Sequence, residues 1–138
     1  MSNLKNFLLE KALRSSARIY LPEINDKRVN EAASELVKLG FNIINHELIN
    51  DKLDIYKNII SKKKFTFNWS DKMKDEFLSS SLNYGLAALE NNDIDCLVAG
   101  ADHSTSDVLK SAIRIIGVEK KTNWISSSFF MNSPNDNF

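Results

Sequence analysis

The residues best suited to chemistry lie together between a short apolar run and a helical pattern. Residues 96–99 are continuously apolar, as expected of a strand covered on both faces. Gly100 and Ala101 let the backbone turn closely, and Ser104 with Asp107 has the spacing of a capping box. We therefore predict a strand, a turn and a helix N-terminus, where free backbone N–H groups and the helix dipole would favour an anion.

The polar side chains of this turn are candidate anion ligands, namely His103, Ser104, Thr105 and Ser106. The hydroxyl groups could contact a phosphate, and pure helix capping is the competing interpretation. His103 could donate to an anion or could be a structural histidine. The apolar residues that predict the helix recur at helical spacing before Gly117: Val108, Leu109, Ala112, Ile113 and Ile116. An anion here would lie at the carboxyl end of a strand, where ligands of open α/β sheets bind.

The first part of the chain predicts the sheet that positions this turn. An amphipathic helix at 3–15 precedes a short strand at 18–23, which a proline closes. Asn25 and Asp26 are N-cap candidates for a helix that Gly40 ends, and a second strand at 41–44 follows directly. Strand, helix and strand in this order imply a right-handed βαβ unit and a parallel sheet.

The middle of the chain is read mainly as helix. Residues 62–64 are lysines with aromatic residues close behind, which could form a nucleic-acid surface. We favour a solvated helix end whose aromatic neighbours pack on the core, because three lysines in a neutral chain give a weak electrostatic footprint. Residues 70–91 carry two adjacent apolar stripes and predict the longest helix, and residues 124–131 predict a buried strand.

The composition indicates a globular protein of one domain. The chain has 138 residues, of which 43% are hydrophobic and 26% charged, with a formal net charge of zero. A neutral chain offers no general attraction for nucleic acid or an anionic membrane, so neither is an expected partner. Cys96, the one cysteine, cannot form an intrachain disulfide and is expected to be a small buried hydrophobe. Without a recognisable signal peptide, the cytoplasm is the expected location.

Three segments of the chain carry the motifs of one enzyme family. The run Val-Ala-Gly-Ala-Asp-His-Ser-Thr-Ser-Asp from Val98 is similar to the pattern Gly-Ala-x-His-[Ser/Thr]-[Ser/Thr]-x-Asp. The run from Arg18 to Ala33 is similar to the opening Leu-Pro-Glu-x-x-Asp-x-Arg-x-x-x-Ala-Ala. Residues 126–131 resemble Ser-Ser-x-Phe-Phe-Met followed by a proline, here Pro134. Together the three segments resemble the phosphate acetyltransferases and phosphate butyryltransferases, and their order and wide separation indicate that residues 1–138 form the amino-terminal part of such a domain.

The resemblance implies a fold and a reaction. The family fold is a three-layer α/β/α architecture with a mostly parallel sheet, related to the isocitrate and isopropylmalate dehydrogenases, with the active site between two domains. The reaction is reversible acyl transfer between coenzyme A and phosphate, most often acetyl-CoA plus phosphate giving acetyl phosphate plus CoA. Coenzyme A and acetyl-CoA would be substrates, no cofactor would be bound tightly, and no metal is obligatory.

The resemblance also carries substrate-binding roles onto particular residues. Arg28 matches a family arginine that reaches toward the cleft, while Lys64 and Lys110 stand where the family has arginines. Lysine keeps the charge but lacks the bidentate fork that suits phosphate. The remaining expected contacts are His103, Ser104, Thr105 and Ser106 in the turn and Ser127 and Ser128 in the third motif.

The length bears on the expected activity. A full family member is more than twice as long, and the family's catalytic aspartate and its serine–arginine pair belong to the carboxy-terminal portion. We therefore expect an acyltransferase chain whose catalytic residues lie outside it, acting as a homodimer or with a carboxy-terminal half. The alternative is a non-catalytic module derived from the family that binds phosphate or CoA without turnover.

Overall fold

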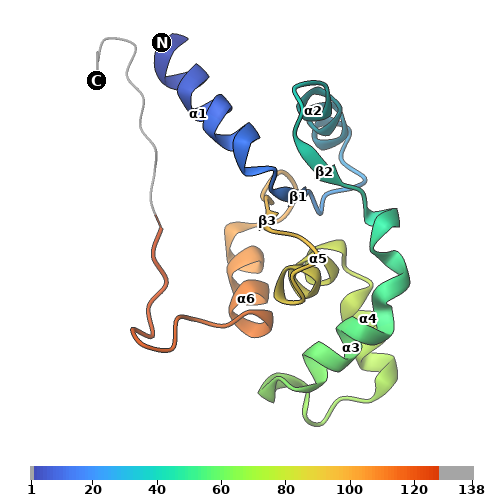
Figure 1. Ribbon diagram of the computed structural model, residues 1–138. Helices are drawn as coiled ribbons and strands as arrows, with labels where there is room; N and C mark the ends of the chain where they lie inside the picture. The colour runs from blue at the N-terminus through green and yellow to red at the C-terminus, as the bar shows by residue number, and fades with distance from the viewer. Residues whose placement is uncertain (1, 128–138) are drawn as a thin grey trace.

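The protein is an α/β structure built on a small parallel sheet, as a computed structural model of residues 2–127 shows (Figure 1). The helices are α1 (Ser2–Ser15), α2 (Lys27–Lys38), α3 (Leu53–Ser61), α4 (Asp71–Leu78), α5 (Ser81–Glu90) and α6 (Thr105–Ile115). The strands are β1 (Arg18–Tyr20), β2 (Asn42–Ile44) and β3 (Cys96–Leu97). Short 3-10 helices span His46–Leu48, Asn50–Lys52 and Lys64–Thr66.

The sheet has the order β2-β1-β3 within the described residues, and both neighbours of β1 run parallel to it. Helices α1 and α2 lie on one side of the sheet and α5 and α6 on the other (Figure 1). This layering confirms the predicted α/β/α architecture. The β1–α2–β2 unit is also confirmed, with Ile19 opposite Ile43 in the register. Because the strands are parallel, their carboxyl ends lie at one edge, which is where α2 and α6 begin.

Local sequence explains the βα connections. Asp26 caps α2 by accepting from the backbone N–H of Arg28 at 2.8 Å. Gly40 ends the same helix with φ of +94°, a conformation that glycine adopts without a steric penalty. The turn therefore delivers the chain into β2 with almost no loop, as the sequence predicts.

The core lies between the sheet and α5. Helix α5 is buried along most of its length and packs against α3, α4, α6 and β3. Tyr20 at the end of β1 is fully buried and lies directly on Gly85 of α5. A Cβ built at residue 85 would come within 2.5 Å of Tyr20 Cδ1 and 2.9 Å of Leu97 Cδ1. Glycine at this position is what allows α5 to approach the strands so closely.

The predicted single helix over residues 70–91 is wrong, because the chain breaks into α4 and α5 at Ser79 and Ser80. The Ser79 hydroxyl donates to the Glu76 carbonyl at 2.6 Å, which satisfies a carbonyl at the end of α4. The Ser81 hydroxyl donates to the Pro22 carbonyl, so the start of α5 is tied to the segment after β1. The residues of each apolar stripe are thus divided between two separate helices.

Two further expectations about strands need correction. The run at 96–99 is not covered on both faces: β3 has two residues at the edge of the sheet, and Val98 is 53% exposed. Cys96 is consequently half-buried instead of fully buried. Residues 124–127 form no strand, and Trp124 is 78% exposed. The rest of that predicted strand, residues 128–131, lies outside the described residues.

Candidate functional site

The turn after β3 closes around a buried carboxylate. Oε1 of Glu23, in the segment between β1 and α2, accepts the backbone N–H groups of four consecutive residues. The donors are Gly100 at 2.7 Å, Ala101 at 2.8 Å, Asp102 at 3.1 Å and His103 at 3.4 Å. Nδ1 of His103 lies 3.2 Å from the same oxygen. Successive N–H groups in a turn form a concave anion site, and here the anion is a side chain of the protein itself.

This environment keeps Glu23 ionised. The Glu23 side chain is 3% exposed, and burial by itself would raise its pKa. The hydrogen bonds from the turn and from His103 outweigh that effect and lower the pKa to about 2. The N–H groups of residues 100–103 are therefore not free for a ligand, because Glu23 occupies them.

Arg28 connects the start of α2 to the same turn. Its Nη2 lies 2.6 Å from Asp26 Oδ2 and 3.0 Å from the Ala101 carbonyl, and its Nε donates to Asp26 Oδ1 at 3.1 Å. Hydrogen bonding to Arg28 lowers the pKa of Asp26 to about 2, so both charges of this pair are kept. The Arg28 side chain is nevertheless 74% exposed, and its Nη1 is left for other partners. Asp26 thus neutralises Arg28 in part but also fixes its orientation.

The start of α6 follows the predicted capping pattern. Ser104 Oγ accepts the Asp107 N–H at 3.1 Å and donates to the Asp107 carboxylate at 2.7 Å. This hydroxyl is therefore already used as a cap. Thr105 and Ser106 form the exposed first turn, and Lys110 is exposed on the same helix. The structure brings Arg28 and residues 103–106 together at the carboxyl edge of the sheet.

The other predicted contacts are separate from this group. Lys64 begins the 3-10 helix that follows α3, at the end of the molecule away from the sheet (Figure 1). Ser127 is exposed in the extended segment after α6, and Ser128 lies outside the described residues. The described part of the chain therefore gathers five of the expected contacts, has Lys110 further along α6, and leaves Lys64 and Ser127 elsewhere.

Glu23 was missed as a member of this site. The sequence assigns the proline–glutamate pair to the end of a strand. The family opening contains this glutamate but does not show that its carboxylate turns inward. A general signal did exist: the turn offers several N–H donors in a row, and such a group needs an acceptor. The acceptor comes from a residue 77 positions earlier, which periodicity alone does not reveal.

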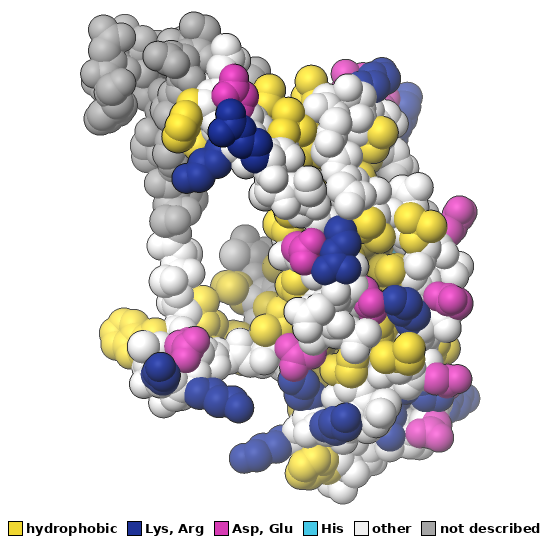
Figure 2. All heavy atoms as spheres, viewed as in Figure 1, with side chains coloured by type: hydrophobic (Ala, Val, Ile, Leu, Met, Phe, Trp, Pro, Cys, Tyr) yellow, Lys and Arg dark blue, Asp and Glu magenta, His cyan; other side chains and the backbone are white. Residues whose placement is uncertain are grey.

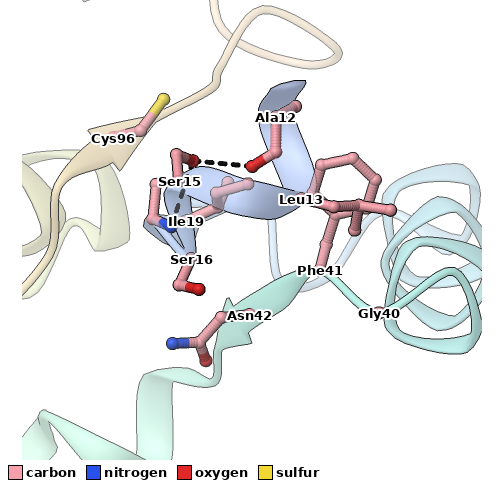
Figure 3. Close-up of a pocket in the computed structure, with 10 residues that line it drawn as sticks. Ala12, Leu13, Ser15, Ser16, Ile19, Gly40, Phe41, Asn42 and Cys96 are labelled. Atoms are coloured by element: carbon pink, nitrogen blue, oxygen red, sulfur yellow. Dashed lines mark hydrogen bonds between the residues drawn. The ribbon is translucent and has the colours of Figure 1, made fainter. Parts of the chain in front are cut away.

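A pocket of about 160 Å³ lies at the opposite edge of the sheet. Small and apolar side chains at the amino ends of the strands line it, among them Leu13, Phe41 and Cys96 (Figure 3). The dashed contacts at Ser15 in this view are its hydroxyl donating to the Ala12 carbonyl at 2.6 Å and accepting the Ala17 N–H at 3.4 Å. Ligands of open α/β sheets bind at the carboxyl edge, and this pocket has no charged side chain in its lining. The turn at residues 100–106 is therefore the better candidate site.

The wider surface has no dominant charge in the view of Figure 2, where Lys and Arg side chains alternate with Asp and Glu. Among residues 2–127, no His, Cys, Asp and Glu side chains form a group of three or more that could hold a metal ion. In the same range, no helix combines the length and apolar character that crossing a membrane requires.

Comparisons with known proteins point to a single family. Residues 38–138 match the family described as phosphate acetyl/butaryl transferase. The chain is 27% identical to a phosphate acetyltransferase of Acetivibrio thermocellus, over 93% of this chain and 46% of the relative. It is 28% identical to a phosphate acetyltransferase of Staphylococcus aureus, over 95% of this chain and 47% of the relative. The chain thus spans less than half the length of these relatives.

A solved structure has the same fold. The phosphotransacetylase from Streptococcus pyogenes superposes with a TM-score of 0.61 at 24% sequence identity. The superposition covers 83% of this chain and 42% of that protein. The fold of this chain is therefore one found in an experimental structure.

Proposed function

The chain belongs to the phosphate acetyl/butaryl transferase family, and we propose on this basis that it takes part in acyl transfer between coenzyme A and inorganic phosphate. Its contribution is the phosphate side of the reaction. Phosphate oxygens and the tetrahedral intermediate of acyl transfer both need positive groups and hydrogen-bond donors fixed in advance. The residues that supply them are Arg28, His103 and the exposed start of α6.

One observation carries this proposal: Arg28 is fixed against the turn that contains the family motif. Its guanidinium contacts the Ala101 carbonyl while it remains 74% exposed. An arginine that is oriented but accessible suits a ligand with several oxygen atoms. Thr105 and Ser106 add hydroxyl groups and the first N–H groups of α6, where the helix dipole favours an anion.

We propose acetyl as the acyl group, because the relatives described above are phosphate acetyltransferases. Acetyl-CoA and CoA are then substrates that come and go, and the cytoplasm is the expected place of the reaction. Lys64 and Ser127 would join the site only when further residues, corresponding to the other half of the relatives, complete it. These could come from a longer form of the chain or from a second polypeptide.

The test combines binding with turnover. Isothermal titration of the 138-residue chain with phosphate and with CoA is run beside a coupled assay for acetyl phosphate. We expect phosphate binding that Arg28→Ala weakens by about tenfold to a hundredfold, the loss of a charge-assisted hydrogen bond. Arg14→Ala is the matched control, since Arg14 is 84% exposed on α1 and pairs only loosely with Glu10 at 3.9 Å.

Each outcome decides between functions. Phosphate binding with turnover establishes the acyltransferase. Binding without turnover, even when acetyl-CoA is saturating, is expected both of a chain whose catalytic residues lie elsewhere and of the non-catalytic module. Turnover on addition of a polypeptide that corresponds to the other half of the relatives then favours the first, and its absence favours the second. Absence of phosphate binding by the unmodified chain, or equal losses from Arg28→Ala and Arg14→Ala, refutes the site.

A further inference from the structure

Glu23 is more deeply involved in the turn than helix capping or surface ion pairing requires. Its single oxygen Oε1 receives the N–H groups of residues 100–103 and lies 3.2 Å from His103 Nδ1. Its side chain is 3% exposed, whereas the His103 side chain is 27% exposed. The carboxylate is therefore inside the turn, and the histidine stands between it and solvent.

The chemistry of this contact fixes the proton on the histidine. An ionised carboxylate is only an acceptor, so the nitrogen that faces it must donate. Glu23 is ionised at neutral pH because its pKa is lowered to about 2. Nδ1 of His103 therefore carries a proton, and Nε2 is left for other partners. In metal and catalytic sites, a carboxylate behind a histidine sets the tautomer and the ring orientation in the same way.

We propose that Glu23 is a positioning residue of the phosphate site: it orders residues 100–103 and holds His103 by Nδ1, so that Nε2 serves the anion beside Arg28. The role rests on the proposed function, since it concerns how the phosphate site is built. Glu23 itself does not touch the ligand. Its effect reaches the anion through His103 and through the Ala101 carbonyl, which receives Arg28 at 3.0 Å.

A competing account makes the opposite prediction. If the N–H groups of residues 100–103 were themselves the phosphate site, Glu23 would be an internal competitor for the ligand. Replacing it with a neutral side chain would then relieve repulsion and strengthen phosphate binding. If Glu23 positions the site, the same replacement weakens binding, because the turn and the His103 ring lose their common acceptor. The direction of the change in affinity separates the two accounts.

The experiment uses nitrogen-15 NMR of the full 138-residue chain. The chain has two histidines, so His46 provides an internal reference for the ring signals of His103. Glu23→Gln removes the charge with little change in shape. Glu31→Gln is the matched control, because Glu31 is 67% exposed on helix α2 and its ion pair among the described residues is a loose one with Lys27, at 3.8 Å. Ring signals, amide hydrogen exchange at residues 100–103 and a titration with inorganic phosphate are recorded for each protein.

We expect a proton on Nδ1 of His103 in the unmodified chain and in Glu31→Gln. In Glu23→Gln we expect a shift toward the Nε2–H tautomer, faster exchange at residues 100–103, and phosphate affinity lower by about tenfold. The His46 ring signals should not move. Unchanged or tighter phosphate binding in Glu23→Gln overturns the proposal.

The unmodified chain gives a test that needs no variant. A His103 whose Nδ1 carries no proton, or residues 100–103 that exchange as fast as exposed amides, overturns the proposal even if Glu23→Gln fails to fold. If instead the His103 signals behave as expected but phosphate causes no change in the unmodified chain, the proposed function fails. In that case, the hydrogen exchange at residues 100–103 and the His103 ring signals still show whether Glu23 orders the turn.

Discussion

The two histidines of this protein occupy similar places but have different partners. His46 follows β2 and His103 follows β3, so both lie beyond the carboxyl ends of parallel strands. Nδ1 of His46 lies 2.7 Å from the phenol oxygen of Tyr20, which is neutral. Nδ1 of His103 lies 3.2 Å from the carboxylate of Glu23, which is charged. The partner determines what each histidine contributes.

The surroundings of His46 make an aromatic cluster, which we define as Tyr20, His46, Tyr56 and Tyr84. The rings of Tyr56 and Tyr84 meet edge to face with centroids 4.7 Å apart, and His46 lies 5.1 Å from Tyr84. Burial is the main cause that raises the pKa of all three tyrosines, so they stay neutral. We call the other group the carboxylate turn: Glu23 with residues 100–103. One group stabilises by packing, and the other arranges backbone N–H groups around a charge.

The largest expected effect is on the aromatic cluster. Gly85→Ala places a methyl group against the Tyr20 ring, 2.5 Å from Cδ1. Overpacking of this kind should lower the free energy of unfolding by about 3 kcal/mol, measured by urea denaturation. A second substitution, Tyr20→Leu, should recover part of the loss by making room. Additive losses in the double variant would show that Tyr20 does not limit the space at residue 85.

The carboxylate turn should respond next, and in a way that depends on pH. Glu23→Gln keeps the shape but replaces charge-assisted hydrogen bonds by neutral ones, at a cost of about 2 kcal/mol near pH 7. The pKa of Glu23 is lower in the folded protein than its ordinary value of 4.5, so its ionised form stabilises the fold. The difference between the two proteins should be complete above pH 4.5 and should be lost as pH falls toward about 2.

Denaturation series at several pH values between 6.5 and 3 check this expectation. The Glu31→Gln protein, changed at an exposed carboxylate, should remain within about 0.5 kcal/mol of the unmodified chain at neutral pH. A difference for Glu23→Gln that grows as the solution is acidified would contradict the assignment of an ionised, hydrogen-bonded carboxylate.

A smaller effect is expected where the comparison is most direct, at the contact between Tyr20 and His46. Tyr20→Phe removes one hydrogen bond without creating a cavity and should cost about 1 kcal/mol. A double-mutant cycle with His46→Phe measures the coupling between the two side chains, which should be of the same size. Zero coupling would mean that the 2.7 Å contact does not stabilise the protein.

The smallest effect is expected at an exposed ion pair outside both groups. Arg18 and Asp95 form a bidentate pair at 2.9 and 2.8 Å, and their side chains are 39% and 45% exposed. Hydrogen bonding to Arg18 is the main cause that lowers the pKa of Asp95. Solvent screening limits the contribution of such pairs, so Asp95→Asn should lower the free energy of unfolding less than any of the changes above. A larger loss in urea denaturation would place this pair on a level with the carboxylate turn.

The sequence predicted the local units of the fold well, because their signals are local. Asp26, Gly40, Ser104 and Gly117 mark helix ends through capping and backbone preference, and the structure confirms each of these ends. The break at Ser79 was missed because apolar residues continue across it. The break depends on a long-range hydrogen bond, which the Ser81 hydroxyl donates to the Pro22 carbonyl.

The candidate site could be predicted only in part, for the same reason. Arg28 and residues 103–106 came from motifs, and the structure places them together. Glu23 stands in the family opening, but neither that motif nor periodicity reveals its role, since its partners are 77 to 80 residues away in the chain. Long-range pairing also decides which face of α6 is buried. Ile115 is fully buried, whereas Leu109 and Ile113 of the predicted stripe are more than 40% exposed.

The position of β1 in the middle of the sheet has a consequence for synthesis of the chain. Its first neighbour, β2, is synthesised after a single helix. Its second neighbour, β3, directly follows Asp95, which is synthesised 77 residues after Arg18. At about 5–20 residues per second, that interval lasts roughly 4 to 15 seconds. During this time one side of β1 has unpaired N–H and C=O groups, the feature by which nascent chains associate wrongly. Because β1 has three residues and is followed closely by Pro22, it offers few backbone groups with which another chain could pair.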